Sequence, residues 1–353
     1  MALKSIKLEN FTVFENIECE FSSGINIFLG ENGTGKTHLL KLLYAFAKCK
    51  SISNGQSVRL DLGKHPGCFF YELFQCFSVD KYSSLALNKS PEITSLSPET
   101  SINFSTSDNK RFNYDMLPDK DVVYSLGKSE SFDKNEIPST YIPAKDILTH
   151  SKGLIPMAKK YSDEMPFEKP LLDIIEKANQ WKPNKLPKLA NITMQSLSII
   201  EKEIGGTVLL ENDEFFIKKD NGSKVSFSCE AEGFKKLGLL WHLLMNENII
   251  KRSVLLWDEP EANLNPKLIP VVVDILLELS RNGVQVFLAT HEYNLMKYFS
   301  VKKKDSDNVA FISLHKTENG VVSEIEDDYN LLEHNSIVEA NIKLLEDDIE
   351  GVF

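Results

Sequence analysis

Two short segments near the start of the chain, residues 3–8 and 17–21, alternate hydrophobic and polar positions. Alternation with a period of two is typical of strands with one buried face, so the two segments predict an antiparallel hairpin. A continuous apolar run at residues 25–29 predicts a strand that is buried on both faces. From Leu39 the apolar positions recur at helical spacing, which predicts a helix that ends near Lys50.

The pattern becomes irregular between residues 51 and 138, where Ser, Asn, Asp and Pro accumulate and only short apolar clusters remain. This composition predicts peripheral strands and long, partly mobile loops. Residues 139–146 predict a short strand that breaks at a proline into a helix. Residues 157–204 have helical periodicity that four prolines interrupt, so we expect short helices and no long coiled coil.

Strand patterns return after residue 206, and Asn221-Gly222 predicts a hairpin turn because this pair readily takes positive φ. A helix is predicted from Ala231 to about Asn246. The acidic residues 333–350 are predicted to be helical, with their charge on a solvated face. The predicted strands of this half are residues 207–210, 214–219, 224–228, 253–260, 284–291, 309–315 and 321–325.

The composition describes a globular protein with an acidic balance. The 353 residues are 42% hydrophobic, enough for one large domain or two ordinary ones. A net charge of −11 does not favour a general nucleic-acid binder, although a local basic groove on a dimer stays open. With no apolar stretch of about eighteen residues and no signal peptide, we expect a cytoplasmic protein without membrane contact. Five cysteines without a CxxC pair indicate reduced thiols rather than disulfides or zinc ligands.

The clearest chemistry lies between the predicted strand at residues 25–29 and the helix after it. Residues 30–37 read Gly-Glu-Asn-Gly-Thr-Gly-Lys-Thr, the spacing of a phosphate-binding loop in its strand–loop–helix context. The glycines allow a tight turn that points backbone N–H groups at an anion. Lys36 is expected to reach the β- and γ-phosphates of a nucleotide, and the Thr37 hydroxyl to bind Mg²⁺. An ordinary glycine turn is the alternative, and the complete match disfavours it.

Two later strands end in polar residues that can complete such a site. The run at residues 253–260 contains Asp258, and a carboxylate at the carboxyl edge of a parallel sheet can order Mg²⁺. Glu259 follows directly and is placed to polarise a water molecule in line with the γ-phosphate. The run at residues 284–291 ends in His291, which can hydrogen-bond a γ-phosphate. Each is an ordinary strand end when taken alone, and the matched loop upstream favours the functional interpretation.

Taken together, these motifs resemble the ABC-type ATPases of the SMC and RecF branch, specifically the compact ones of prokaryotic genome-maintenance and anti-phage defence operons, including the ATPase half of OLD-like proteins. The resemblance covers residues 1–50 and about 225–315. It implies an α/β ABC ATPase head, a P-loop NTPase with a mixed central sheet, an N-terminal antiparallel β-subdomain and a helical insertion. The residues that match the Walker A loop of this family are Gly30, Asn32, Gly33, Thr34, Gly35, Lys36 and Thr37.

The resemblance also implies ATP and Mg²⁺ as cofactors. Thr37 and Asp258 would hold the metal, Glu259 would be the catalytic glutamate of the Walker B motif, and His291 would be the switch histidine. Residues 261–266 look like the D-loop, which crosses the dimer interface in this family.

A signature motif that binds the ATP of the other subunit is expected at residues 231–236, with Glu232, Gly233 and Lys235 as its binding residues. The motif lacks the Ser-Gly-Gly of transporters and SMC proteins and keeps a single glycine. No clear glutamine loop follows the first helix, and residues 144–146 are the best positional candidate for it. These departures concern the details of γ-phosphate sensing.

The expected organisation is a single discontinuous ATPase head over residues 1–353. Its predicted parts are the hairpin and Walker A loop (1–50), a loop-rich insertion (51–138), a helical subdomain (139–204), the part with the second hairpin, signature helix, Walker B, D-loop and switch histidine (205–330), and an acidic tail (331–353).

The function favoured by these observations is an ATP-hydrolysing switch that forms a head-to-head homodimer, or a higher oligomer, when it binds ATP. No second catalytic constellation follows His291, and the chain is expected to be too short there for a fused nuclease. We therefore expect a separately encoded effector, a nuclease or toxin of an anti-phage system. The alternative is a RecF-like DNA-binding ATPase clamp in repair or genome maintenance. The altered signature disfavours a transporter subunit, and nucleotide binding without hydrolysis would leave Glu259 idle.

Overall fold

A mixed six-stranded sheet forms the centre of the protein, with the strand order β14-β13-β3-β12-β11-β7. The computed structural model describes residues 2–49, 69–79, 82–87, 100–117, 122–124, 137–146, 148–154, 156–157, 167–180, 191–318 and 320–351. All neighbours in the central sheet are parallel except β14, which pairs antiparallel with β13. Its strands are β3 (Ile25–Leu29), β7 (Ser139–Ile142), β11 (Val254–Asp258), β12 (Gln285–Ala289), β13 (Val309–Thr317) and β14 (Gly320–Glu326).

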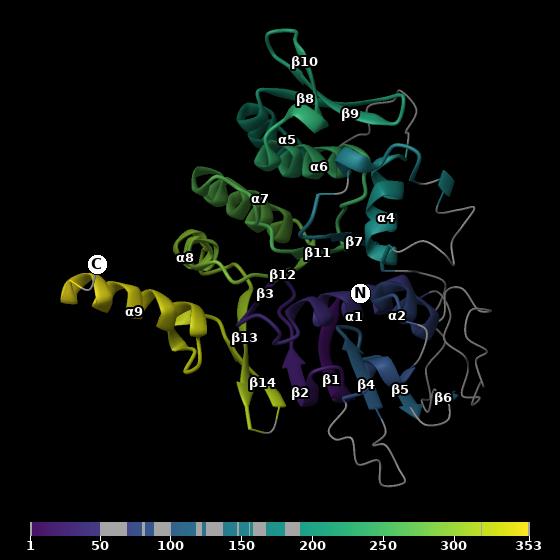
Figure 1. Ribbon diagram of the computed structural model, residues 1–353, viewed down its shortest axis with the longest axis vertical. Helices are drawn as coiled ribbons and strands as arrows, with labels where there is room; N and C mark the ends of the chain where they lie inside the picture. The colour runs from purple at the N-terminus through teal and green to yellow at the C-terminus, as the bar shows by residue number, and fades with distance from the viewer. Residues whose placement is uncertain are drawn as a thin grey trace.

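Every residue of β3, β11 and β12 is buried, as their continuous apolar runs predict. Helix α1 (Lys36–Lys48) covers one face of this sheet and separates it from a second, antiparallel sheet, shown below α1 in Figure 1. The second sheet has the order β2-β1-β4-β5-β6. Its strands are β1 (Leu3–Phe11), β2 (Phe14–Glu20), β4 (Thr100–Thr106), β5 (Arg111–Leu117) and β6 (Val122–Tyr124).

Aromatic side chains fill the space between α1 and the antiparallel sheet. The ring of Phe46 stacks on that of Phe104 with centroids 4.1 Å apart, and Phe69 stacks on Tyr114 at the same distance. Phe69 opens α2 (Phe69–Phe77), which packs against α1. The expectation of strands and loops alone for residues 51–138 is therefore wrong at α2, while β4 and β5 are the expected peripheral strands.

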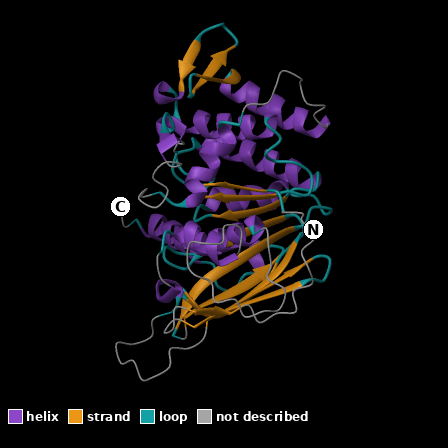
Figure 2. Ribbon diagram, turned by 90° about the vertical axis from the view of Figure 1, so that its right-hand side faces the viewer, coloured by secondary structure: helices purple, strands orange, loops and turns teal. Residues whose placement is uncertain are grey.

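Helices cover the opposite face of the central sheet and share a second hydrophobic core with it (Figure 2). A small antiparallel sheet of β8 (Gly206–Glu211), β9 (Glu214–Lys219) and β10 (Lys224–Ser226) lies at the far end of this layer. The helices are α4 (Lys169–Ala178), α5 (Asn191–Ile204), α6 (Glu232–Met245), α7 (Ile269–Arg281) and α8 (Tyr293–Lys302), and α9 (Ser336–Glu350) lies at the side of the molecule.

Most predicted elements are confirmed, including the first hairpin, in which Ser5 pairs with Glu20 and Phe11 with Phe14. The helix expected after Pro143 is absent from residues 143–146, and residues 148–150 form a 3₁₀ turn instead. Among the described residues, no helix combines the length and the hydropathy needed to cross a membrane.

Candidate nucleotide site

The segment from Gly30 to Thr37, called the phosphate loop below, joins β3 to α1. Its glycines have backbone angles that other residues rarely adopt, with φ of 140° at Gly30 and 90° at Gly35. A Cβ atom on Gly30 would lie 2.3 Å from the carbonyl oxygen of Leu314, and one on Gly35 would lie 2.4 Å from the ring of Phe14. The loop therefore needs glycine at both positions, for backbone conformation and for space.

Helix α1 begins without a side-chain cap, since its N-cap residue is Gly35. The first N–H groups of a helix have no partner within it, so this end favours an anion. Lys36 is 8% exposed, and its Nζ donates to the carbonyl oxygens of Gly30 and Glu31 at 2.7 and 2.8 Å. Burial lowers the pKa of this ammonium, against the nearby carboxylates Glu259 and Asp258, which raise it. A positive charge and free amide donors thus meet at one loop.

Asp258 is the last residue of β11 and lies beside the first turn of α1. The Thr37 hydroxyl donates to its carboxylate, at 2.9 Å from Oδ2, and the Tyr141 hydroxyl is 3.3 Å from the same oxygen. Burial raises the pKa of Asp258, and the charge of Glu259 adds to this, while the two hydroxyls oppose it. Hydroxyl and carboxylate oxygens are the ligands that Mg²⁺ prefers in proteins. The donor set at Thr37 and Asp258 therefore fits a magnesium ion.

Glu259 and His291 face each other at the ends of β11 and β12. The Nδ1 atom of His291 is 3.4 Å from Oε1 of Glu259, and the two side chains are 51% and 34% exposed. Glu259 has a φ of 47°, and its N–H donates to the carbonyl oxygen of Ala289. A positive φ at a non-glycine residue is uncommon and often accompanies a functional position. The pair is open to solvent, where a water molecule can reach it.

Three nearby residues make contacts at the site that the sequence did not predict. Besides Tyr141, the Lys236 ammonium donates to the backbone carbonyl of Glu259 at 3.0 Å. Glu261 is buried and accepts a 2.6 Å hydrogen bond from the Thr290 hydroxyl. Burial raises the pKa of Glu261, against that hydrogen bond. These contacts hold the segments that carry Glu259 and His291. Glu261 lies in the D-loop candidate and Lys236 in the signature candidate, whereas Tyr141 lies in neither motif.

The expected signature residues lie at the start of α6, next to the D-loop candidate. A Cβ atom on Gly233 would lie 3.2 Å from the side chains of both Leu264 and Leu268, so a larger residue would push α6 away. Lys235 is 6% exposed, and its ammonium lies 2.6 Å from Glu232 and 3.8 Å from Asp146. Lys235 is thus held inside its own subunit, and the Asp146 of the glutamine-loop candidate contacts this lysine.

A phosphate loop before a helix, acids after a neighbouring parallel strand, and an antiparallel sheet beside the mixed one define the class of this protein. It has the fold of the ABC-type ATPase heads of the SMC and RecF branch. The crystal structure of an SMC head bound to the C-terminal winged-helix domain of ScpA aligns with a TM-score of 0.59 at 14% identity, over 94% of this chain and 99% of that one. The SMC head domain from Thermotoga maritima aligns with a TM-score of 0.51 at 15% identity, over 93% and 99% of the two chains.

Sequence comparison points to the same branch. The DNA replication and repair protein RecF of Listeria welshimeri is 53% identical over 51 residues, 14% of each chain. RecF of Phocaeicola vulgatus is 42% identical over 73 residues, 20% of this chain and 18% of that one. The similarity thus spans less than a quarter of these relatives. The profile of the family described as "AAA domain, putative AbiEii toxin, Type IV TA system" matches residues 88–297, more than half of the chain. The protein belongs to this AAA-domain family.

Proposed function

We propose that the protein binds ATP with Mg²⁺ and hydrolyses it to ADP and phosphate. The observation that carries this proposal is the meeting of the phosphate loop, Asp258 and the Glu259–His291 pair at one edge of the central sheet. They follow β3, β11 and β12, which are parallel neighbours. The carboxyl ends of such strands are where α/β proteins bind their ligands.

Each residue has a role that its contacts support. Lys36 would give up its two carbonyl contacts and bind phosphate oxygens instead. The amides of the phosphate loop and of the start of α1 would donate to the same phosphates. Thr37 and Asp258 would hold Mg²⁺, which neutralises phosphate charge when it is bound. Glu259 would orient a water molecule and accept its proton, and His291 would share the hydrogen bond.

The same surface supports an ATP-dependent, head-to-head homodimer. Glu259 and His291 are partly exposed, so one subunit leaves this side of the site uncovered. Helix α6 begins beside the D-loop candidate, and its N-cap residue Ala231 supplies no side-chain cap. A second subunit would present this helix end to the γ-phosphate through the backbone N–H groups of Glu232 and Gly233, because the side chains of Glu232 and Lys235 are paired with each other.

The Glu259→Gln variant tests hydrolysis and dimerisation together. We expect phosphate release to slow by about 100-fold or more, the scale of a general base, while ATP binding persists. The variant should accumulate an ATP-bound dimer in light scattering, and the same variant with Lys36→Ala should stay monomeric. A Glu259→Gln protein that is saturated with ATP and remains monomeric would exclude the dimer.

We also propose that this ATP-dependent switch controls a separate protein and that it does so in the cytoplasm. Helix α9 supports the control of a separate protein. Residues Val338, Ile342, Leu345 and Ile349 follow the four-three-four spacing of a coiled-coil seam. The last three are 50%, 62% and 85% exposed, on a helix that projects from the body in Figure 1. Acidic residues flank the seam at Glu339, Glu346 and Asp348, so a partner with a basic, apolar helix fits it better than a second copy does.

A pull-down with proteins of the native operon tests this assignment. We expect a stoichiometric partner, a nuclease or other toxin, that Leu345→Glu releases. Leu344→Glu is the matched control, because Leu344 is 55% exposed but lies outside the seam. Recovery of no stoichiometric partner, or equal loss with both variants, would contradict the proposal.

A RecF-like DNA clamp is the second candidate, and the similarity to RecF proteins favours it. The net charge of −11 and the acidic α9 speak against a large DNA-binding surface. Salt-dependent affinity for duplex DNA that appears only with ATP and Glu259→Gln would establish the clamp. Its absence would favour the switch.

A further inference from the structure

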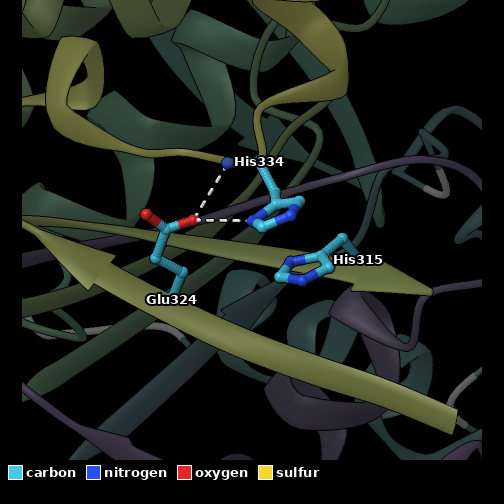
Figure 3. Close-up of side chains that lie close together, drawn as sticks. All are labelled: His315, Glu324 and His334. Atoms are coloured by element: carbon cyan, nitrogen blue, oxygen red, sulfur yellow. Dashed lines mark hydrogen bonds and ion pairs between the residues drawn. The ribbon is translucent and has the colours of Figure 1, made fainter. Parts of the chain in front are cut away.

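Three side chains with metal-binding atoms converge at the edge of the central sheet, and none of them is among the nucleotide-site residues described above. His315 lies on β13, Glu324 on β14, and His334 in the segment before α9, and one ligand atom from each lies within 4.8 Å of the others. On the paired strands His315 is opposite Val322, so Glu324, two residues further on, projects from the same face as His315. Figure 3 shows the two imidazole rings beside the carboxylate.

The surroundings fix the carboxylate and leave a histidine nitrogen without a partner. The Glu324 oxygens accept hydrogen bonds from the N–H groups of Glu333 and His334, at 2.6 and 3.0 Å, and Nδ1 of His334 lies 3.6 Å away. The Nδ1 atom of His315 is buried and has no hydrogen-bond partner among the described residues. A neutral imidazole carries a lone pair on one ring nitrogen, and such a lone pair can bind a metal ion.

We propose that His315, Glu324 and His334 form a zinc site with an open fourth position. Two imidazole nitrogens and one carboxylate are a ligand set that zinc accepts, with a water molecule as the fourth ligand. The backbone amides that hold Glu324 would orient this ligand, as supporting hydrogen bonds do around metal ligands.

The geometry requires one modest movement. The two rings are stacked, with centroids 4.1 Å apart and an interplanar angle of 11°, whereas both lone pairs must point at one ion. In a tetrahedral zinc site the ligand atoms lie about 3.3–3.5 Å apart, closer than the 4.8 Å limit here. His334 is 58% exposed at its side chain, so its ring can turn without disturbing the core.

Zinc at this site would tie α9 to the sheet. The Ser313 hydroxyl of β13 already donates to the carbonyl oxygen of His334, and Asn335 caps the first turn of α9. The site thus lies at the base of the helix proposed above to bind a partner. Zinc binding itself does not depend on that proposal, nor on ATP.

Calorimetry with untagged, chelator-stripped full-length protein tests the site. Excess Mg²⁺ competes with zinc at Asp258, and a Cys229→Ser background removes the thiol that is exposed among the described cysteines. We expect about one Zn²⁺ per chain, and about tenfold or greater weakening in each of His315→Ala, Glu324→Gln and His334→Ala. Glu333→Gln is the matched control, because Glu333 contacts Glu324 through its backbone N–H.

Two further measurements separate metal binding from a structural role. Zn²⁺ should raise the Tm of the parent protein but not that of His334→Ala, whose exposed ring is removed without a core cavity. X-ray absorption of the loaded protein should show nitrogen and oxygen ligands without sulfur. No saturable binding, or binding that His334→Ala and Glu324→Gln leave unchanged, would overturn the site.

Discussion

Two aspartates near opposite ends of α1 are buried to a similar degree, but their pKa values are shifted in opposite directions. Asp173 is 5% exposed and Asp258 is 7% exposed. Asp173 lies 2.8 Å from the ammonium of Lys169, 3.5 Å from that of Lys48, and 2.7 Å from the Tyr44 hydroxyl. Burial alone would raise the pKa of Asp173, but the two lysines and these hydrogen bonds lower it below its usual 3.8.

At the phosphate loop the opposite charges are kept apart. Asp258 is contacted by two hydroxyls, and Lys36 is held by two backbone carbonyl oxygens. Burial therefore raises the pKa of Asp258 and lowers that of Lys36, and neither group forms an ion pair within 4 Å among the described residues. The buried charges around Asp173 pair with one another, and we call this the paired region. The buried charges at the phosphate loop are kept apart and are therefore available to the opposite charges of a ligand, and we call this the prepared region.

Removing the cation of the prepared region should have the largest effect. Lys36→Ala deletes the charge that would meet the β- and γ-phosphates, so we expect ATP affinity to fall by about 100-fold or more, the scale of a lost buried, charge-assisted contact. Fluorescent-nucleotide titration measures this. The double variant Lys169→Ala, Lys48→Ala is the control from the paired region, and it should keep the affinity of its folded fraction. If Lys36→Ala and the parent protein bound ATP with equal affinity, the phosphate loop would not be part of the nucleotide site.

Breaking the paired region should cost stability instead. Asp173→Asn leaves Lys169 and Lys48 without their carboxylate, and we expect about 3 kcal/mol of destabilisation, near the lower end for a broken buried pair because both lysines reach solvent. Urea unfolding followed by circular dichroism measures the loss. Per folded molecule, phosphate release should stay at the parental rate, and a large decrease in that rate would mean that Asp173 belongs to the active region.

The division between these regions also explains what the sequence could and could not predict. The phosphate loop, Asp258, Glu259 and His291 lie within short motifs or at the ends of apolar runs, so local patterns place them. Tyr141 reaches Asp258 across 117 positions, and Asp173 reaches Tyr44 across 129. Contacts at such separation depend on how the strands and helices pack, and no local pattern records them.

The insertion after α1 was harder to predict for a different reason. The sequence of α2, Phe-Phe-Tyr-Glu-Leu-Phe-Gln-Cys-Phe, is short and mostly apolar, so its periodicity does not separate a buried helix from a buried strand. Packing against α1 decides between them. The orientation of Lys235 was equally hidden, because Asp146, which helps to hold it, lies 89 positions upstream.

Neutralising the acid of the prepared region should have two effects of opposite sign. Asp258→Asn should slow phosphate release by about 100-fold or more, since the amide is a poor Mg²⁺ ligand. The same change removes a buried charge that forms no ion pair in the described part of the chain, so we expect it to stabilise the nucleotide-free protein by about 1 kcal/mol. Urea unfolding without Mg²⁺ checks the second effect. Destabilisation like that of Asp173→Asn would show that Asp258 is a structural ion.

The smallest expected effect is the difference in how acidification changes the contributions of Asp258 and Asp173 to stability. The folded-state pKa of Asp258 is raised, so its unfavourable contribution is complete above that pKa and disappears as the pH falls toward 3.8. The folded-state pKa of Asp173 is lowered, so its favourable contribution is complete above 3.8 and is lost below it. From pH 7 toward pH 4, the Tm gap between Asp258→Asn and the parent should therefore shrink by about a degree or more, while the gap for Asp173→Asn persists. Because other groups titrate equally in parent and variant, these differences isolate each aspartate. If both Tm differences shrank over the same pH range, the two carboxylates would not differ in their pairing.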